Sequence, residues 1–188
     1  MGRIGIPLLF ESKPFQLIES GQFLNFLYLV TTKSNTKMSS IPEKFLGKFK
    51  HEKSENFEEY LAARGVSWIF RKLISFTSIT KVFEKSTSAT GKYDAHNISS
   101  KGDTPYIGWT LDEEFEAKGL DGKQHKITFQ MDGEDTLTEK HIRLDKEGKA
   151  EPENVGEIYR YSIDDNDKLV LTLEKDSITA RRFFTRVQ

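Results

Sequence analysis

Residues 56–74 read NFEEYLAARGVSWIFRKLI, and this stretch carries the helical signals of the chain. Asn56 is followed three positions later by Glu59, a pair that favours a helix start, and Gly65 is a typical helix stop. A second short helix can begin at Ser67. Apolar residues share one side of each expected helix: Phe57, Tyr60 and Leu61, then Trp68, Ile69, Leu73 and Ile74. The stretch therefore predicts a helix, a tight glycine turn and a second helix.

After about residue 75 the apolar residues recur at every second position, as they do in strands with one buried face. The alternation is clear in residues 127–131, 169–173 and 178–184. Asp-Gly pairs at 121–122 and 132–133 separate such segments, and this dipeptide favours two-residue hairpin turns. The pattern predicts a run of hairpins in which consecutive strands are neighbours.

A long antiparallel meander leaves two unpaired edges, and closure into a barrel removes them. Two short helices cannot cover an open sheet, but they can cover the mouth of a barrel. We therefore expect an all-β fold, an up-and-down barrel with a two-helix lid. Its interior can either fill with side chains or hold one small ligand.

Composition excludes several classes of function. The chain has 188 residues with 28 Lys and Arg against 29 Asp and Glu, a formal net charge of -1, which argues against a duplex nucleic-acid binder. The absence of cysteine excludes disulfides, Cys-ligated zinc, Fe–S clusters and thiol catalysis. The four histidines lack metal-ligand spacing and no catalytic constellation is visible. We therefore expect that the protein binds no metal and no cofactor and is not an enzyme.

The first 37 residues differ from the rest because they show no clear period and end in a polar run. Residues 1–37 are expected to form a poorly ordered N-terminal extension, either a leader or sequence before an alternative start. Residues 38–188 are expected to form the compact domain.

Several motifs resemble the signature of one family. The N-terminal set is Gly47-Lys-Phe49, residues 56–61, Gly65-Val66 and Arg71-Lys72; the later set is residues 111–116, Asp121-Gly-Lys, residues 168–173 and Arg182-x-Phe184. In this order they resemble the intracellular fatty-acid-binding proteins of the calycin superfamily, over roughly residues 45–187. The long loop at residues 145–156 is similar to the extended loops of some nematode members.

The resemblance implies a ten-stranded antiparallel β-clam with a two-helix lid and a cavity for a long-chain fatty acid or fatty acyl derivative. It implies a non-catalytic lipid chaperone, monomeric and cytoplasmic or nuclear. The family holds the ligand carboxylate with two arginines and a tyrosine; Arg182 and Arg160 match the arginines, whereas Phe184 replaces the tyrosine and removes its hydroxyl. The expected tail contacts, each with ordinary core packing as the alternative, are Phe57, Leu61, Phe129, Leu171 and Leu173.

The alternation of residues along the strand supports an interpretation of Arg182 that does not depend on the family. Arg182 shares a strand face with Ile178 and Ala180. If that face points inward, an unpaired guanidinium costs on the order of several kcal/mol, which a bidentate carboxylate would offset. The alternatives are that Arg182 faces solvent, or that it pairs with an internal carboxylate such as Glu157.

Three other hypotheses follow from the lid and the termini. Arg64, Arg71 and Lys72 are interleaved with apolar residues 68–70, so the lid could touch a membrane transiently; the alternative is a solvated face whose apolar side packs on the barrel rim. The chain could instead be a β-barrel protein-interaction module without a ligand. It could also be a secreted lipid carrier, if residues 1–37 act as a leader.

Overall fold

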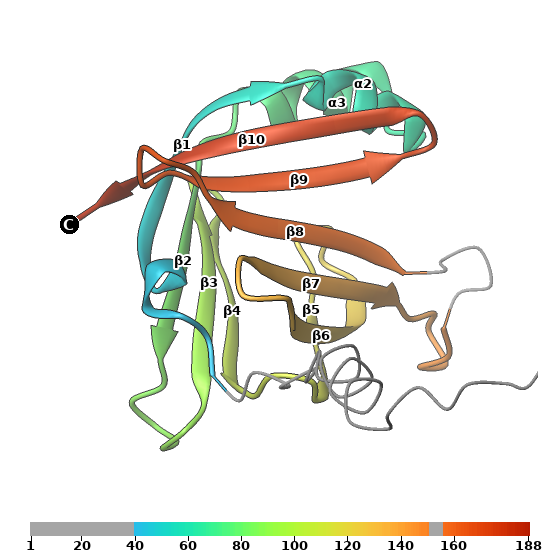
Figure 1. Ribbon diagram of the computed structural model, residues 1–188. Helices are drawn as coiled ribbons and strands as arrows, with labels where there is room; N and C mark the ends of the chain where they lie inside the picture. The colour runs from blue at the N-terminus through green and yellow to red at the C-terminus, as the bar shows by residue number, and fades with distance from the viewer. Residues whose placement is uncertain (1–39, 151–155) are drawn as a thin grey trace, which may run out of the picture. The chain divides into compact units, whose positions relative to one another are not determined.

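The computed structural model describes residues 40–150 and 156–188 (Figure 1). The expected extension at residues 1–37 lies outside the described residues, as do five residues of the loop at 145–156. The described chain has a short 3-10 turn, η1, two helices and ten strands. Their bounds are η1 Glu43–Phe45, β1 Gly47–Glu55, α2 Phe57–Ala63, α3 Trp68–Ser75, β2 Ile79–Lys85, β3 Tyr93–Ser99, β4 Gly102–Trp109, β5 Glu114–Lys118, β6 Gln124–Asp132, β7 Thr136–Arg143, β8 Glu157–Ile163, β9 Leu169–Lys175 and β10 Ile178–Val187.

The strands form one antiparallel sheet in the order β4-β3-β2-β1-β10-β9-β8-β7-β6-β5. Consecutive strands are neighbours except for β4 and β5, and β1 pairs with β10 as well as with β2. That pairing joins the start and the end of the domain and curls the sheet into a barrel, which is open between β4 and β5, the two ends of the sheet order. The expected ten-stranded, nearly closed barrel with two helices is confirmed.

The helix pair lies at one end of the barrel, where α2 packs against β10 and β9 (Figure 1). Asn56 precedes α2 in a left-handed conformation with φ of 53°, and its Nδ2 donates to the Thr179 carbonyl at 3.1 Å. The side chain therefore ties the helix start to β10 and does not form the cap that the sequence suggests. Gly65 ends α2 with φ of 75°, as expected for a glycine stop.

An aromatic cluster fills part of the interior. Phe129 is fully buried and stacks on Trp109 at a ring-centroid distance of 3.9 Å, with Phe83 at 6.3 Å in an edge contact. Phe83 also meets the ring of Tyr161 at 5.4 Å. This cluster joins β2, β4, β6 and β8 and leaves the space nearer the helices for other residues.

Among the described residues, no group of three or more His, Cys, Asp or Glu side chains is placed to hold a metal ion. No helix in the described ranges is long and apolar enough to cross a membrane.

Candidate functional site

A pocket of about 430 Å³ lies between the helix pair and the inner faces of the strands. The helices contribute apolar side chains, including Phe57 and Leu61 of α2. The strands contribute Leu171 and Leu173 of β9, together with several charged residues. The wall is therefore apolar beneath the helices and polar elsewhere.

Arg182 of β10 lines this pocket and is 6% exposed. Its Nε donates to Ser54 Oγ on β1 at 3.3 Å, and its guanidinium carbon lies 4.4 Å from the ring centroid of Phe57 and 5.6 Å from that of Phe184. Burial lowers the pKa of Arg182 to about 10. No carboxylate of the described residues lies within ion-pair distance of it. The guanidinium thus faces the interior; its contact with a ligand stays a prediction.

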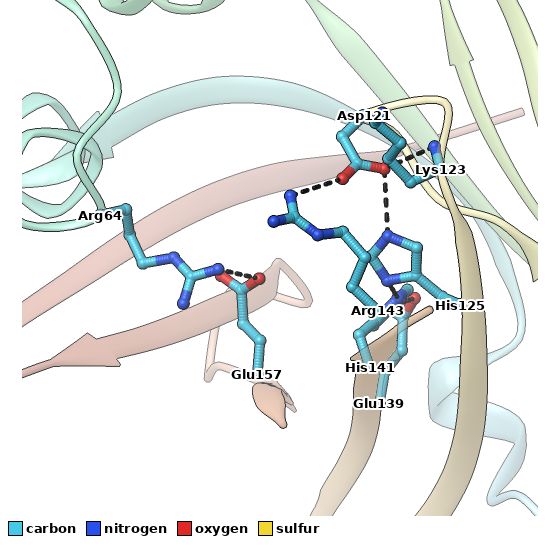
Figure 2. Close-up of polar contacts among 8 residues, drawn as sticks. All are labelled: Arg64, Asp121, Lys123, His125, Glu139, His141, Arg143 and Glu157. Atoms are coloured by element: carbon cyan, nitrogen blue, oxygen red, sulfur yellow. Dashed lines mark hydrogen bonds and ion pairs between the residues drawn. The ribbon is translucent and has the colours of Figure 1, made fainter. Parts of the chain in front are cut away.

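The alternative partner of Arg182, Glu157, is engaged elsewhere. It pairs with Arg64, the residue just after α2, at 3.1 Å (Figure 2). It also accepts a hydrogen bond from the Tyr60 hydroxyl. These contacts tie α2 to β8 at the pocket rim.

Arg160 lies on the outer face of the barrel, and this placement corrects the expectation that it faces the ligand. Its Nη1 pairs with Glu174 of the neighbouring strand at 3.2 Å, and it does not line the pocket. The reason is strand parity: Tyr159 lines the pocket and Tyr161 is fully buried, so Arg160 between them points outward.

The expected tail contacts divide into two groups. Phe57, Leu61, Leu171 and Leu173 line the pocket. Phe129 does not line it, nor does Phe184, the residue in place of the head-group tyrosine, and both are fully buried in the core. Their ordinary packing role is therefore the one that the structure supports. Phe184 meets the ring of His51 in an edge contact at 5.4 Å.

Sequence reasoning missed a buried polar chain in the pocket wall. Glu139 Oε1 lies 2.7 Å from His141 Nε2, His141 Nδ1 lies 3.3 Å from His125 Nδ1, and His125 Nε2 lies 3.0 Å from Asp121 Oδ1 (Figure 2). Glu139 and His141 are 2% and 4% exposed. The signal was present in the sequence, because Glu139 and His141 continue the inward alternation that begins at Leu137.

The hydrogen bonds of this buried polar chain depend on which of its side chains carry protons. Burial alone would raise the pKa of Glu139, but Lys81 and His141 lower it to about 2, so the carboxyl group is ionised. Backbone and histidine contacts likewise hold the pKa of Asp121 below its ordinary value, against the opposing effect of burial. Each Nε2 must then donate to a carboxylate, and the contact between the two Nδ1 atoms is a hydrogen bond only if one of them carries a further proton.

A second missed residue is Lys81 of β2, which lines the pocket and is 5% exposed. Its Nζ donates to Asn97 Oδ1 at 2.7 Å and lies 5.0 Å from the ring centroid of Tyr161. Lys81 stands between Ile79 and Phe83 in the alternation of β2, at a position where an apolar residue would be ordinary. The pocket therefore holds two buried cations, Arg182 and Lys81.

Comparison with known proteins gives a consistent family. No family model matches the chain. The chain is 45% identical over 149 residues to fatty acid-binding protein homolog 4 of Caenorhabditis elegans, which covers 79% of this chain and 98% of that protein. Among solved structures, As-p18, an extracellular fatty acid binding protein, matches with a TM-score of 0.72 and 39% identity over 79% of this chain and 99% of that one.

A Schistosoma mansoni fatty acid binding protein, solved in complex with arachidonic acid, matches with a TM-score of 0.62 and 25% identity over 77% of this chain and 97% of that one. The identity and coverage of the Caenorhabditis elegans relative are those of a family member, and the strand order and paired helices are common to the solved structures. The chain therefore belongs to the fatty acid-binding protein family.

Proposed function

We propose that the protein is a non-catalytic carrier that binds one long-chain fatty acid or fatty acyl derivative reversibly in its pocket, with the carboxylate on Arg182. The observation that carries the proposal is the burial of the Arg182 guanidinium in the pocket wall, without a carboxylate partner among the described residues. A buried charge of this kind favours a ligand of opposite charge. The arachidonic acid held by the Schistosoma mansoni relative supports the ligand class.

The size of the pocket supports a lipid carrier over an interaction module with a filled barrel. Its volume of about 430 Å³ falls in the range of roughly 300–1,000 Å³ typical of small-molecule sites. Burying ~14 methylenes at ~0.8 kcal/mol each gives roughly 11 kcal/mol, against an association cost of about 4–15 kcal/mol. The tail alone does not fix the affinity, so the head-group contact decides it.

The test is a titration of delipidated protein with oleate. We expect saturable binding near one oleate per chain, and Arg182→Gln should weaken it by roughly 10-fold or more, the usual effect of losing a charged hydrogen bond. Arg181→Gln is the matched control, because Arg181 is the exposed neighbour on the same strand. Absence of oleate uptake by the wild-type protein would contradict the proposal, as would an unchanged oleate affinity in a folded Arg182→Gln variant.

We also propose that α3 touches membranes transiently while lipid is exchanged. Trp68, Ile69 and Phe70 are 62%, 64% and 62% exposed, and Phe76 just after the helix is 85% exposed. Lys72 follows the first three of them, with a side chain that is 43% exposed and pairs with Glu58, so apolar and basic groups lie close together on the surface. The alternative of an apolar side packed on the rim suits Ile74, which contacts the core, but not these residues.

For location we propose the cytoplasm or nucleus, with the protein acting as a monomer. The secreted carrier is the second candidate, and the extracellular relative As-p18 favours it. Cell fractionation together with sequencing of the mature N-terminus distinguishes the two. A chain found in the medium and cleaved within residues 1–37 would show secretion.

A further inference from the structure

Lys81 and Arg182 reach the same pocket from different strands. Lys81 belongs to β2, whereas Tyr161, whose ring lies under its ammonium, belongs to β8. Strands β1, β10 and β9 separate β2 from β8 in the sheet, so the Lys81 side chain extends across the interior of the barrel. Arg182 of β10 faces the same space and interacts electrostatically with Tyr161. Tyr161 is thus a common neighbour of the two cations.

Neither cation has an anionic partner at contact distance among the described residues. Lys81 has three N–H donors, and the structure gives it one hydrogen-bond acceptor, the neutral Asn97. The nearby buried carboxylate, Glu139, already accepts hydrogen bonds from His141 and from the Tyr161 hydroxyl. Burial lowers the pKa of Lys81, Glu139 opposes this, and Arg182 lowers the pKa further. Two basic side chains therefore face one pocket, and neither forms an ion pair with a carboxylate of the described residues.

Two of the three head-group contacts that the family resemblance implies are missing from this pocket. Arg160 pairs with Glu174 on the outer face, and Phe184 has no hydroxyl. A carboxylate held by both oxygens on Arg182 still has lone pairs that can accept a hydrogen bond from a second cation. Lys81 stands in the pocket wall as a second cation that could fill that role.

We infer that Lys81 is a second head-group residue: an ionised carboxylate binds between the Lys81 ammonium and the Arg182 guanidinium, and Lys81 selects ionised fatty acids over neutral lipids such as alcohols. This inference rests on the proposed function. The bound carboxylate replaces the repulsion between the two cations with two attractive contacts. A neutral hydroxyl head group cannot do so, and it leaves the repulsion between the two side chains in place.

The experiment compares oleate with oleyl alcohol, which has the same chain and a neutral head group. In Lys81→Met we expect oleate affinity to fall by roughly 10-fold or more, with oleyl alcohol affinity unchanged. Lys101→Met is the matched control, because Lys101 lines the pocket at an exposed position. The control should keep the wild-type preference for oleate.

Removing Lys81 alone leaves the buried Glu139 carboxylate without its main cationic neighbour, so the single variant could unfold. The double variant Lys81→Met with Glu139→Gln removes both charges and keeps hydrogen-bonding atoms for Tyr161 and His141. It should fold and should also lose the preference for oleate. Circular dichroism checks the fold of each variant.

A proton measurement gives a readout that a merely structural role would not change. A bound carboxylate should raise the lowered pKa of Lys81, so the wild-type protein should take up protons when oleate binds at alkaline pH. Calorimetry in two buffers of different ionisation enthalpy measures this uptake. The Lys81→Met variants should lose it.

The outcomes separate this inference from the function on which it rests. If wild-type protein binds no oleate, the proposed function fails. If wild-type protein binds oleate but the folded Lys81 variants keep both the preference for oleate over oleyl alcohol and the proton uptake, the role of Lys81 is overturned and the carrier function stands.

Discussion

At the scale of single residues, the surroundings of Arg182 control the protonation of a neighbouring histidine. His51 of β1 forms a hydrogen bond between its Nε2 and Ser54 Oγ at 2.8 Å, and its ring meets that of Phe184 in an edge contact. Burial, followed by the charge of Arg182, lowers the pKa of His51 to about 4. His51 is therefore neutral in the folded protein over a pH range in which an unfolded chain would protonate it.

The sign of the resulting pH dependence follows from linkage. Between pH 6.5 and about 4 the unfolded chain binds a proton at His51 and the folded chain does not, so the free energy of unfolding falls as the pH drops through this window. Above pH 6.5 the residue is neutral in both states and contributes no slope. Replacing it by Gln should reduce the loss of stability across the window by about 1–2 kcal/mol, after allowance for solvent screening.

Urea unfolding of wild type and His51→Gln at pH 7, 6, 5 and 4 measures this difference. His96→Gln serves as the control, because His96 is a rim histidine paired with Asp103. Parallel pH profiles for wild type and His51→Gln would show that His51 is protonated in the folded state.

How far the sequence predicts the site depends on how regular each strand is. On β10 one set of alternating positions is buried, Ala180, Arg182 and Phe184, and parity alone places Arg182 inward. On β8 both faces of the strand carry apolar residues near Arg160: Ile158 is 38% exposed, whereas Tyr161 is buried. The sequence alone therefore does not show which way the Arg160 side chain points. Lys81 and Glu139 were missed because a charged residue at an inward position contradicts the pattern used to find strands.

At the scale of elements, α3 is exposed along most of its length. No residue of Trp68–Ser75 is buried, although the amphipathic pattern predicts an apolar side against the barrel. The apolar residues surround more of the helix than one contact face can cover, so Ile74 packs and Trp68, Ile69 and Phe70 do not. An exposed apolar surface of this kind is suited to a lipid interface.

We expect the double variant Trp68→Ser with Phe70→Ser to bind vesicles containing anionic lipid more weakly and to transfer fatty acid to them more slowly. Its equilibrium affinity for oleate should stay the same, because neither residue lines the pocket. Co-sedimentation with vesicles and a transfer assay with a fluorescent fatty acid measure the two effects. The matched control is Ile107→Ser on β4, a residue that is 55% exposed; equal transfer rates in all three proteins would contradict the membrane role.

The turns show what element-level prediction can and cannot give. Asp121-Gly122 was expected to form a two-residue hairpin turn, and it does lie between β5 and β6, with Gly122 at φ of 76°. The connection is longer than two residues, since β5 ends at Lys118 and β6 begins at Gln124. Asp121 accepts hydrogen bonds from the Lys123 amide and pairs with His125, contacts that the dipeptide alone does not reveal.

At the scale of the whole molecule, the interior is divided between a packed region and a pocket. The alternation of the strands predicts which residues face inward and hence the barrel. It does not predict whether inward residues touch one another across the interior. Phe129 meets Trp109 and Phe83, and this contact fills its region, whereas Leu173 on β9 faces the pocket. Inward apolar residues of the same alternating pattern thus form either core or cavity wall, depending on what lies opposite.

This division predicts effects of different size on stability for two apolar substitutions. Phe129→Leu should lower the free energy of unfolding of the ligand-free protein, in the direction of the about 3–5 kcal/mol that Phe→Ala costs in cores, because it opens a void beside Trp109. Leu173→Ala should lower that free energy less, because its side chain borders existing space.

The stability that oleate adds should rank the two variants in the reverse order, with the larger loss in Leu173→Ala. A ligand stabilises the folded state by RT ln(1 + [L]/Kd), about 2.7 kcal/mol at a free concentration of 100 Kd. Phe129→Leu should keep the full wild-type increment, since the pocket wall is untouched, whereas Leu173→Ala removes a tail contact, raises Kd and reduces the increment. Urea unfolding with and without excess oleate measures both quantities. An increment that falls in Phe129→Leu and persists in Leu173→Ala would mean that the fatty acid lies among the aromatic residues, and that the pocket beneath the helices is not where it binds.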